Sequence, residues 1–178
     1  MLTPPETIET ERLLLRVPVM EDAAAILETY ARDPEVTRYL AWKPPQTLEE
    51  SEQSIRSRVE GWHKGFSFSW TILLKEGGAL VGMVSLRTQG PRLNIGFIMA
   101  RPHWGRGYTT EATRPVLDWA LSQPGVYRVS AVCDTENLAS ARVLEKIGMQ
   151  LEGTLRRWDV HPAISDVPRD CLCYAAVK

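Results

Sequence analysis

Residues 95–112 place an apolar run directly before a glycine loop and a helix pattern, and this order restricts the fold more than any other feature of the chain. The run at 93–99 predicts a strand, Gly105-x-Gly107 predicts a sharp turn, and a helix is expected over 108–122. Glycine lets the backbone approach a ligand closely. Because the first N–H groups of a helix lack internal partners and the helix dipole adds positive potential there, the segment favours an anion such as a phosphate.

The glycine loop alone leaves two interpretations open, a phosphate site and a plain turn. Two named phosphate motifs are excluded by the residues present. A P-loop requires G-x4-G-K-[S/T], which the chain lacks, and the dinucleotide fingerprint requires a third glycine where Thr110 stands. Further motifs are therefore needed to choose between the two.

Strand and helix patterns alternate through the rest of the chain. Strands are expected at 13–17, 66–74, 80–86, 93–99, 127–132 and 171–177, and helices at 23–31, 47–63, 108–122 and 139–147. The short connections between the three central strands predict an antiparallel meander. Thr47 and Glu50 form a capping box at the start of the second helix. The sequence predicts one α/β domain over 1–178, with its core from about residue 10, built on a mixed, mostly antiparallel sheet flanked by helices.

Charge and composition bear on partners and location. The 178 residues carry 21 Lys and Arg against 22 Asp and Glu, a net charge of -1, so the basic surplus of a duplex nucleic-acid binder is missing. No apolar run approaches the length of a membrane span, and the first residues lack the pattern of a signal peptide. We expect a cytoplasmic protein without nucleic-acid or membrane partners, and a homodimer stays open. Three cysteines and three scattered histidines form no zinc pattern, so no metal is expected.

Three motifs resemble those of the GNAT superfamily of N-acetyltransferases, and more narrowly its ribosomal-protein alanine N-acetyltransferases of the RimJ and RimL type. They are Thr10-Glu-Arg-Leu-x-Leu-Arg16, Trp104-Gly-Arg-Gly-Tyr-Thr-Thr-Glu-Ala112 and Asn137-x-x-Ser140-x-x-Val-Leu-Glu-Lys-x-Gly148. They follow in the expected order over nearly the whole chain. The resemblance implies a GNAT-like domain whose sheet is splayed between its fourth and fifth expected strands, with acetyl-CoA as the co-substrate between them.

The same resemblance implies roles for individual residues. Those expected to bind acetyl-CoA are Phe97, Ile98, Met99, Trp104, Gly105, Arg106, Gly107, Tyr108, Thr109, Asn137 and Ser140. Ser140 would also protonate the leaving thiolate, because Leu144 stands where many members of the superfamily carry a tyrosine acid. Asp159 matches the position of a carboxylate proposed as the base in the RimJ and RimL branch. His161 and a relay through water are the alternatives to Asp159.

The expected activity is therefore acetyl transfer from acetyl-CoA to a primary amine, by direct attack within a ternary complex. The amine would be a protein α-amine or a small-molecule amine. Cys133 lies near the expected slot, but no paired cysteine and histidine indicate an acyl-enzyme. Two alternatives remain: a catalytically silent CoA-binding scaffold protein, and an acyltransferase that uses another acyl-CoA such as succinyl-CoA.

Overall fold

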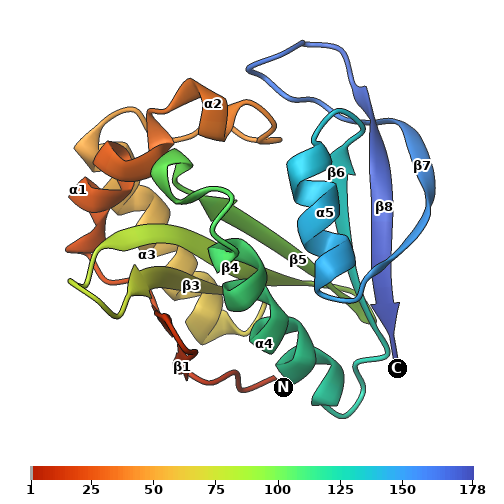
Figure 1. Ribbon diagram of the computed structural model, residues 1–178, viewed down its shortest axis with the longest axis horizontal. Helices are drawn as coiled ribbons and strands as arrows, with labels where there is room; N and C mark the ends of the chain where they lie inside the picture. Colours follow the sequence, from red (N-terminus) through yellow and green to blue (C-terminus); the bar gives the residue numbers. More distant parts are fainter. Residues whose placement is uncertain (1) are drawn as a thin grey trace.

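The computed structural model describes residues 2–178, and its strands form one mixed sheet with helices on both faces (Figure 1). The strands are β1 Thr7–Glu9, β2 Leu13–Arg16, β3 Ser67–Leu74, β4 Leu80–Gln89, β5 Arg92–Met99, β6 Arg128–Asp134, β7 Gln150–Asp159 and β8 Arg169–Val177. Across the sheet they follow the order β1-β2-β3-β4-β5-β6-β8-β7. Neighbours are antiparallel except β5 and β6, which run parallel. The predicted fold class is confirmed.

The α-helices are α1 Asp22–Ile26, α2 Pro34–Thr37, α3 Leu48–Lys64, α4 Tyr108–Ser122 and α5 Leu138–Lys146, with a π-helical turn η1 Leu27–Ala31 and a 3-10 turn η2 Arg101–His103. Three of these five α-helices, α2, α3 and α5, begin at a side-chain cap. The capping box of α3 is confirmed, since the Thr47 hydroxyl accepts from the Glu50 N–H at 3.2 Å and the Glu50 carboxylate accepts from the Thr47 N–H. The helix α2 was not expected. Asp33 caps the Glu35 N–H at 3.0 Å and Pro34 occupies the first helical position, so this dipeptide starts a helix as well as interrupting one.

The central meander β3-β4-β5 follows from period-two alternation. Phe68, Trp70 and Ile72 of β3 point to one face and are fully buried in the main core. The small residues Ser69 and Thr71 face the other way and are also fully buried, because α3 and α1 cover that face. The predicted antiparallel pairing of β3 with β4 and of β4 with β5 is confirmed.

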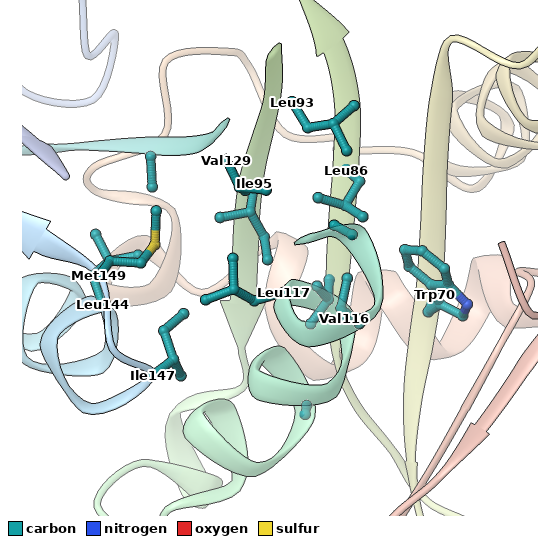
Figure 2. Packing of buried hydrophobic residues seen from close by; sticks show 14 of the residues in the cluster. Trp70, Leu86, Leu93, Ile95, Val116, Leu117, Val129, Leu144, Ile147 and Met149 are labelled. Atoms are coloured by element: carbon teal, nitrogen blue, oxygen red, sulfur yellow. The ribbon is translucent and has the colours of Figure 1, made fainter. Parts of the chain in front are cut away.

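The main core lies between the sheet and the two helices α4 and α5. Figure 1 shows α4 and α5 in front of the sheet and α3 behind it. In Figure 2, Val116 and Leu117 of α4 lie beside Leu86 of β4 and Ile95 of β5. Leu144 of α5 extends the same core toward β6. Each large apolar side chain buried in this way stabilises the fold by about 1.5–3 kcal/mol.

The sequence patterns missed one strand at each end of the sheet, β7 and β1. β7 was not predicted, because nearly all its residues are exposed and it pairs on one side only, with β8. β1 was missed as well, since three residues give too short a pattern to detect. With β1 included, the expected fourth and fifth strands are β5 and β6.

The parallel pair β5-β6 separates soon after it forms. Only Leu93 with Val129 and Asn94 with Ser130 are in register, so beyond Asn94 the edge of β5 facing β6 has no ladder partner. In Figure 1 the two strands diverge toward the end of the sheet near α2. The predicted splay between these strands is confirmed.

Candidate active site

A cleft of about 1270 Å³ lies where β5 and β6 diverge. We call the part lined by residues 97–110 and 137–146 the loop half, because it contains the glycine loop. We call the part lined by residues 35–42, Arg58 and the cleft-facing residues of β4 and β5 up to Gly96 the arginine half. The two halves meet at the unpaired edge of β5.

The glycine loop delivers free N–H groups to the loop half. Gly105 and Gly107 have left-handed backbones, with φ of 72° and 81°, a conformation that other residues adopt at a cost. The first bond of the α4 ladder runs from the Glu111 N–H to the Gly107 carbonyl at 3.0 Å. Among the described residues, the N–H groups of 105–110 have no hydrogen-bond partner. Since Gly105, Gly107 and Thr109 line the cleft, this arrangement fits a diphosphate.

The N-terminal segment holds this loop in place. The Glu111 carboxylate accepts from the Thr10 hydroxyl at 2.6 Å, the Arg12 N–H at 2.8 Å and the Arg12 Nε at 2.7 Å. The Arg12 guanidinium also donates to the Arg106 carbonyl at 3.1 Å and lies 4.5 Å from the centre of the Tyr108 ring. Burial alone raises the pKa of Glu111, but the hydrogen bonds from Thr10 and Arg12 lower it overall. Thr10 and Arg12 of the first sequence motif therefore hold the second motif, which contains the glycine loop, in place. This role was not visible when each motif was interpreted separately.

Strand register decides which backbone groups of β5 face the splay. The Ala100 N–H donates to the Val81 carbonyl of β4 at 2.8 Å, so Ile98, two residues earlier, also directs its backbone groups toward β4. The alternate residues Phe97 and Met99 face β6. The Trp104 indole N–H donates to the Met99 carbonyl at 2.7 Å, which leaves the N–H of Met99 and both groups of Phe97 on the free edge.

Two predicted residues lie at the start of α5 on the opposite wall. The Asn137 side chain caps the helix by accepting from the Ser140 N–H at 3.1 Å. The cap uses the backbone of Ser140, and the hydroxyl forms no hydrogen bond with residues 2–178. Asn137 and Ser140 both line the cleft. The Ser140 hydroxyl and the Asn137 amide N–H groups are thus available to a ligand.

An irregular stretch of β7 brings Asp159 to the cleft. The register with β8 shifts between Leu155 and Asp159, and Arg157 within this stretch has a left-handed backbone with φ of 52°. This strained conformation is held by a hydrogen bond from the Arg157 N–H to the Asp170 carboxylate at 2.9 Å. Asp159 is half-buried and lines the cleft.

His161 lines the same wall and is backed by a buried carboxylate. Its Nε2 lies 3.4 Å from Asp134 Oδ2, and its Nδ1 is buried with no partner among the described residues. Asp134 also accepts from Arg169 at 2.6 Å. Burial alone raises the pKa of Asp134, but the hydrogen bonds from Arg169 and the Glu136 N–H lower it overall. An Nε2–H directed at this anion leaves the Nδ1 lone pair free to accept a proton.

Burial disfavours Cys133, the nucleophile candidate considered from the sequence. Burial raises the pKa of the Cys133 thiol to about 12, assisted by the nearby Cys171, Asp134 and Glu145. A thiol that stays protonated is a poor nucleophile. Leu144 is 2% exposed and belongs to the core, so its position supplies no acid.

The structure brings most of the predicted site residues together. Those that line the cleft are Phe97, Ile98, Met99, Trp104, Gly105, Gly107, Thr109, Asn137, Ser140 and Asp159. Arg106 and Tyr108 do not line it: Arg106 is exposed on the loop, and the Tyr108 ring packs beneath Arg12. For these two residues the backbone N–H is what remains to contact a ligand.

The arginine half was missed by the sequence analysis. Arg38, Arg58, Arg87 and Arg92 line it, together with Tyr39, Trp42 and Ser85. These residues come from α3, β4, β5 and the segment that follows α2, and they share no motif. A detectable signal existed at Arg58, which falls between Ile55 and Trp62 on the inward stripe of α3, where a cation is unusual.

Residues 2–178 lack the features of two other classes of site. None of the helices there is long and apolar enough to cross a membrane. Nor does that part of the chain contain a group of three or more His, Cys, Asp or Glu side chains placed to hold a metal ion.

Comparisons with known proteins agree with this geometry. Residues 12–150 match the model of the acetyltransferase (GNAT) domain family. An uncharacterized N-acetyltransferase of Bacillus subtilis, YoaA, is 31% identical over 96% of both chains. The crystal structure of a GNAT-family acetyltransferase from Bacillus anthracis superposes with a TM-score of 0.83 at 26% identity, covering 96% of this chain and 98% of the other.

A fourth match concerns the fold alone. The ribosomal L7/L12 α-N-protein acetyltransferase RimL, solved in complex with coenzyme A, superposes with a TM-score of 0.85 at 17% identity, covering 97% of this chain and 98% of RimL. The family match extends over most of the chain and includes the splayed strands, the glycine loop and the start of α5. The chain therefore belongs to the GNAT family of acetyltransferases.

Proposed function

We propose that the protein transfers an acetyl group from acetyl-CoA to a primary amine in one step, within a ternary complex. The observation that carries this proposal is the pairing of two sets of free backbone groups in one cleft. The N–H groups of residues 105–110 suit the pyrophosphate, and the unpaired β5 edge suits the amides of the pantetheine arm. RimL, which shares the fold, is known in complex with coenzyme A.

The residues of the loop half would bind the donor from both walls. Gly105, Arg106, Gly107, Tyr108 and Thr109 offer backbone N–H groups to the pyrophosphate. Phe97 and Met99 offer the β5 edge to the pantetheine arm, and Asn137 offers its amide N–H groups from α5. Ile98 and Trp104 contribute indirectly, Ile98 as cleft wall and Trp104 by holding the Met99 carbonyl at 2.7 Å.

The reaction needs a neutral amine next to the thioester. The amine nitrogen attacks the carbonyl carbon, the C–S bond breaks, and the thiolate takes up a proton. The N–H groups on the β5 edge stabilise the oxyanion that develops. Ser140 donates the proton to the sulfur, since its hydroxyl is free and faces the cleft. The amine proton passes to Asp159 or to His161, both of which line the wall beyond β6.

The acceptor that suits this site has a low pKa. Reference pKa values are about 7.7–8 for an α-amine and about 10.4 for lysine, so roughly one α-amine in ten is neutral at pH 7, against about one lysine in 2,500. A site without a strong base therefore favours an α-amine. The high pKa of the Cys133 thiol, which burial raises to about 12, supports direct transfer over an acyl-enzyme on this residue.

The test is a screen of short peptides and amines with acetyl-CoA, read by release of free thiol. Acetylated product with thiol release supports the proposal. A panel that includes succinyl-CoA identifies a different donor. Coenzyme A binding by calorimetry without turnover of any amine would instead make the protein a scaffold. An acetyl group on Cys133 after incubation with donor alone, seen by mass spectrometry, would overturn direct transfer.

A further inference from the structure

The arginine half contains a group of cations without counterions. Among residues 2–178, no carboxylate lies within 4 Å of Arg38, Arg58, Arg87 or Arg92. Six arginines elsewhere in the described chain are paired with an Asp or Glu, namely Arg12, Arg16, Arg56, Arg101, Arg128 and Arg169. Glu35 is the carboxylate that lines this half, and it does not reach Arg58. The four arginines of this half therefore place unpaired positive charge in the cleft.

Arg58 is fixed rather than freely solvated. It extends from α3 over the β3-β4 meander, is half-buried, and donates from Nη1 to the Ser69 hydroxyl at 3.2 Å. Ser69 is fully buried and its hydroxyl lies 2.9 Å from that of Ser85. The Trp42 ring centre lies 5.8 Å from the guanidinium. A guanidinium has five N–H donors, and Ser69 takes one, so the rest remain for a ligand.

Electrostatics favour an anion at this position. Burial lowers the pKa of Arg58 and the nearby Arg87 lowers it further, while Tyr30 raises it. Arginine nevertheless stays protonated in proteins, so the chain holds an uncompensated cation in a partly desolvated place. A carboxylate would supply the missing charge and match the planar guanidinium through two parallel hydrogen bonds.

We infer that the amine acceptor carries a carboxylate and that Arg58 binds it. This inference rests on the proposed function and names the substrate class for the same cleft. The anion belongs to the acceptor because the free N–H groups that suit the donor's diphosphate are on α4, in front of the sheet, whereas Arg58 approaches from α3, behind it (Figure 1).

Sheet geometry sets the distance between the carboxylate and the amine. Ser69 is in register with Ser85, and Ser85 with Gly96, so the point where Arg58 is held lies two strand spacings from β5, or about 10 Å. An extended peptide spans roughly 3.3–3.6 Å per residue. The acceptor is therefore a short peptide segment with a carboxylate two to three residues from its α-amine, either at a C-terminus or on an acidic side chain.

The experiment compares three peptides that differ only in their carboxylate. Trialanine has a free C-terminal carboxylate, trialaninamide has none, and alanyl-aspartyl-alaninamide has one on a side chain. We expect wild type at saturating acetyl-CoA to prefer a carboxylate peptide over trialaninamide by about tenfold to a hundredfold in kcat/KM. Whichever of the two is preferred identifies the source of the carboxylate. Equal kcat/KM for all three would overturn the inference and leave the proposed function intact.

Substitutions at position 58 test whether the Arg58 side chain causes the preference for a carboxylate peptide. Arg58→Met should raise KM for the preferred peptide by about tenfold, leave trialaninamide unchanged and leave CoA affinity unchanged, while Arg58→Lys restores part of the preference. Arg56→Met, on the same helix but exposed and paired with Glu52 at 2.9 Å, is the control and should behave as wild type. Equal loss toward all three peptides in Arg58→Met would show a structural role instead.

A binding measurement keeps the test independent of turnover. The N-acetylated forms of the three peptides can be titrated into the CoA-bound wild-type protein by calorimetry. Tighter binding of a carboxylate form supports the inference, and equal binding contradicts it. If no peptide or other amine is ever acetylated, the proposed function fails, and this titration still decides whether the anion site exists.

Discussion

The two halves of the cleft are built in opposite ways. The loop half comes from two continuous segments, residues 97–110 and 137–146, and its glycine loop is held in place by the ion pair of Arg12 with Glu111 at 2.6 Å. The arginine half is assembled from α2, α3, β4 and β5, and its arginines have no carboxylate partner in the described chain. The glycine loop offers a ligand its backbone N–H groups, whereas the arginine half offers side chains without ion pairs.

This difference fits the two kinds of ligand that we propose for the halves. Backbone N–H groups of consecutive residues recognise a phosphate through main-chain geometry, so glycines and a helix start suffice, and both leave a local sequence pattern. Recognition by charged side chains requires groups from several strands and helices, which only the folded sheet brings together. The comparison therefore predicts that changes in one half alter the binding of one substrate only.

The largest effect is expected for Ser140→Ala, on the α5 wall of the loop half. Its hydroxyl is free while its N–H completes the α5 cap, so alanine removes the proton donor and keeps the cap. We expect kcat to fall about tenfold to a hundredfold, within the range of general acid catalysis, with CoA affinity and Tm nearly unchanged. Steady-state kinetics, calorimetry and melting curves of one preparation measure all three quantities.

Two further variants separate catalysis from helix capping. Asn137→Ala removes the cap itself and should destabilise the fold by about 1 kcal/mol. Ser57→Ala removes an exposed hydroxyl on α3 that bonds the Gln53 carbonyl, and should change nothing. If Ser140→Ala melts earlier with normal kcat, Ser140 is structural and the thiolate takes its proton from solvent.

The next effect is expected for Gly107→Val, which affects the loop half alone. At φ of 81° a β-branched residue is strained, and its Cβ would lie 3.6 Å from Arg12 Nη2, the group that steadies the loop. We expect CoA affinity to weaken at least tenfold, or about 1.4 kcal/mol. Binding of the N-acetylated peptides by the arginine half should change little.

Gly125 provides the matched control for strain. It has φ of 80°, with no atom within 4 Å of an added Cβ, and it lies outside the main cleft. Gly125→Val should lose stability for the same backbone reason while CoA affinity stays at the wild-type value. Equal CoA affinity in wild type and a folded Gly107→Val protein would contradict the assignment of the loop.

The predictable parts of the molecule are those specified by neighbours in the sequence. The capping box of Thr47 and Glu50, the alternation in β3 and the turn at Gly105 and Gly107 depend on residues a few positions apart, and the structure contains each of them. Ser140 could be singled out through its motif, but only the structure shows that its hydroxyl takes no part in the cap of α5.

The parts that escaped prediction depend on distant partners. β7 has almost no buried face, so its pairing with β8 left no hydrophobic pattern. The bond from Trp104 to the Met99 carbonyl depends on how the loop folds back, and the place of Arg58 depends on Ser69 in another element. The position of Arg58 on the inward stripe of α3 marks it as unusual in the sequence, but its partner and the cleft that it lines are visible only in the structure.

The smallest effect is expected for Glu111→Gln, which tests whether internal pairing is what makes the loop half rigid. Glutamine keeps the shape but loses the charge that accepts from Thr10 and Arg12. We expect Tm to fall by roughly 2–4 °C and CoA affinity to weaken on the order of threefold. Glu60→Gln, on the exposed surface of α3 beside Lys64, makes the same chemical change and should leave both quantities unchanged.

The pH dependence of the Tm of Glu111→Gln gives a second test of the role of the Glu111 charge. The pKa of Glu111 lies below its ordinary value of 4.5 in the folded protein, because hydrogen bonds from Thr10 and Arg12 outweigh the effect of burial. The folded state therefore favours the carboxylate, and the associated stability is present above pH about 4.5 and lost as pH falls through the lower folded value. The difference in Tm between wild type and Glu111→Gln should accordingly be largest at neutral pH and shrink below pH about 4.5.

Other carboxylates also lose stability in acid, but they do so in both proteins and cancel in this difference. A Tm difference that stays constant from neutral to acidic pH would show that the Glu111 charge does not tether the loop, and the rigidity of the loop half would then have to come from the packing of Tyr108 and α4 alone.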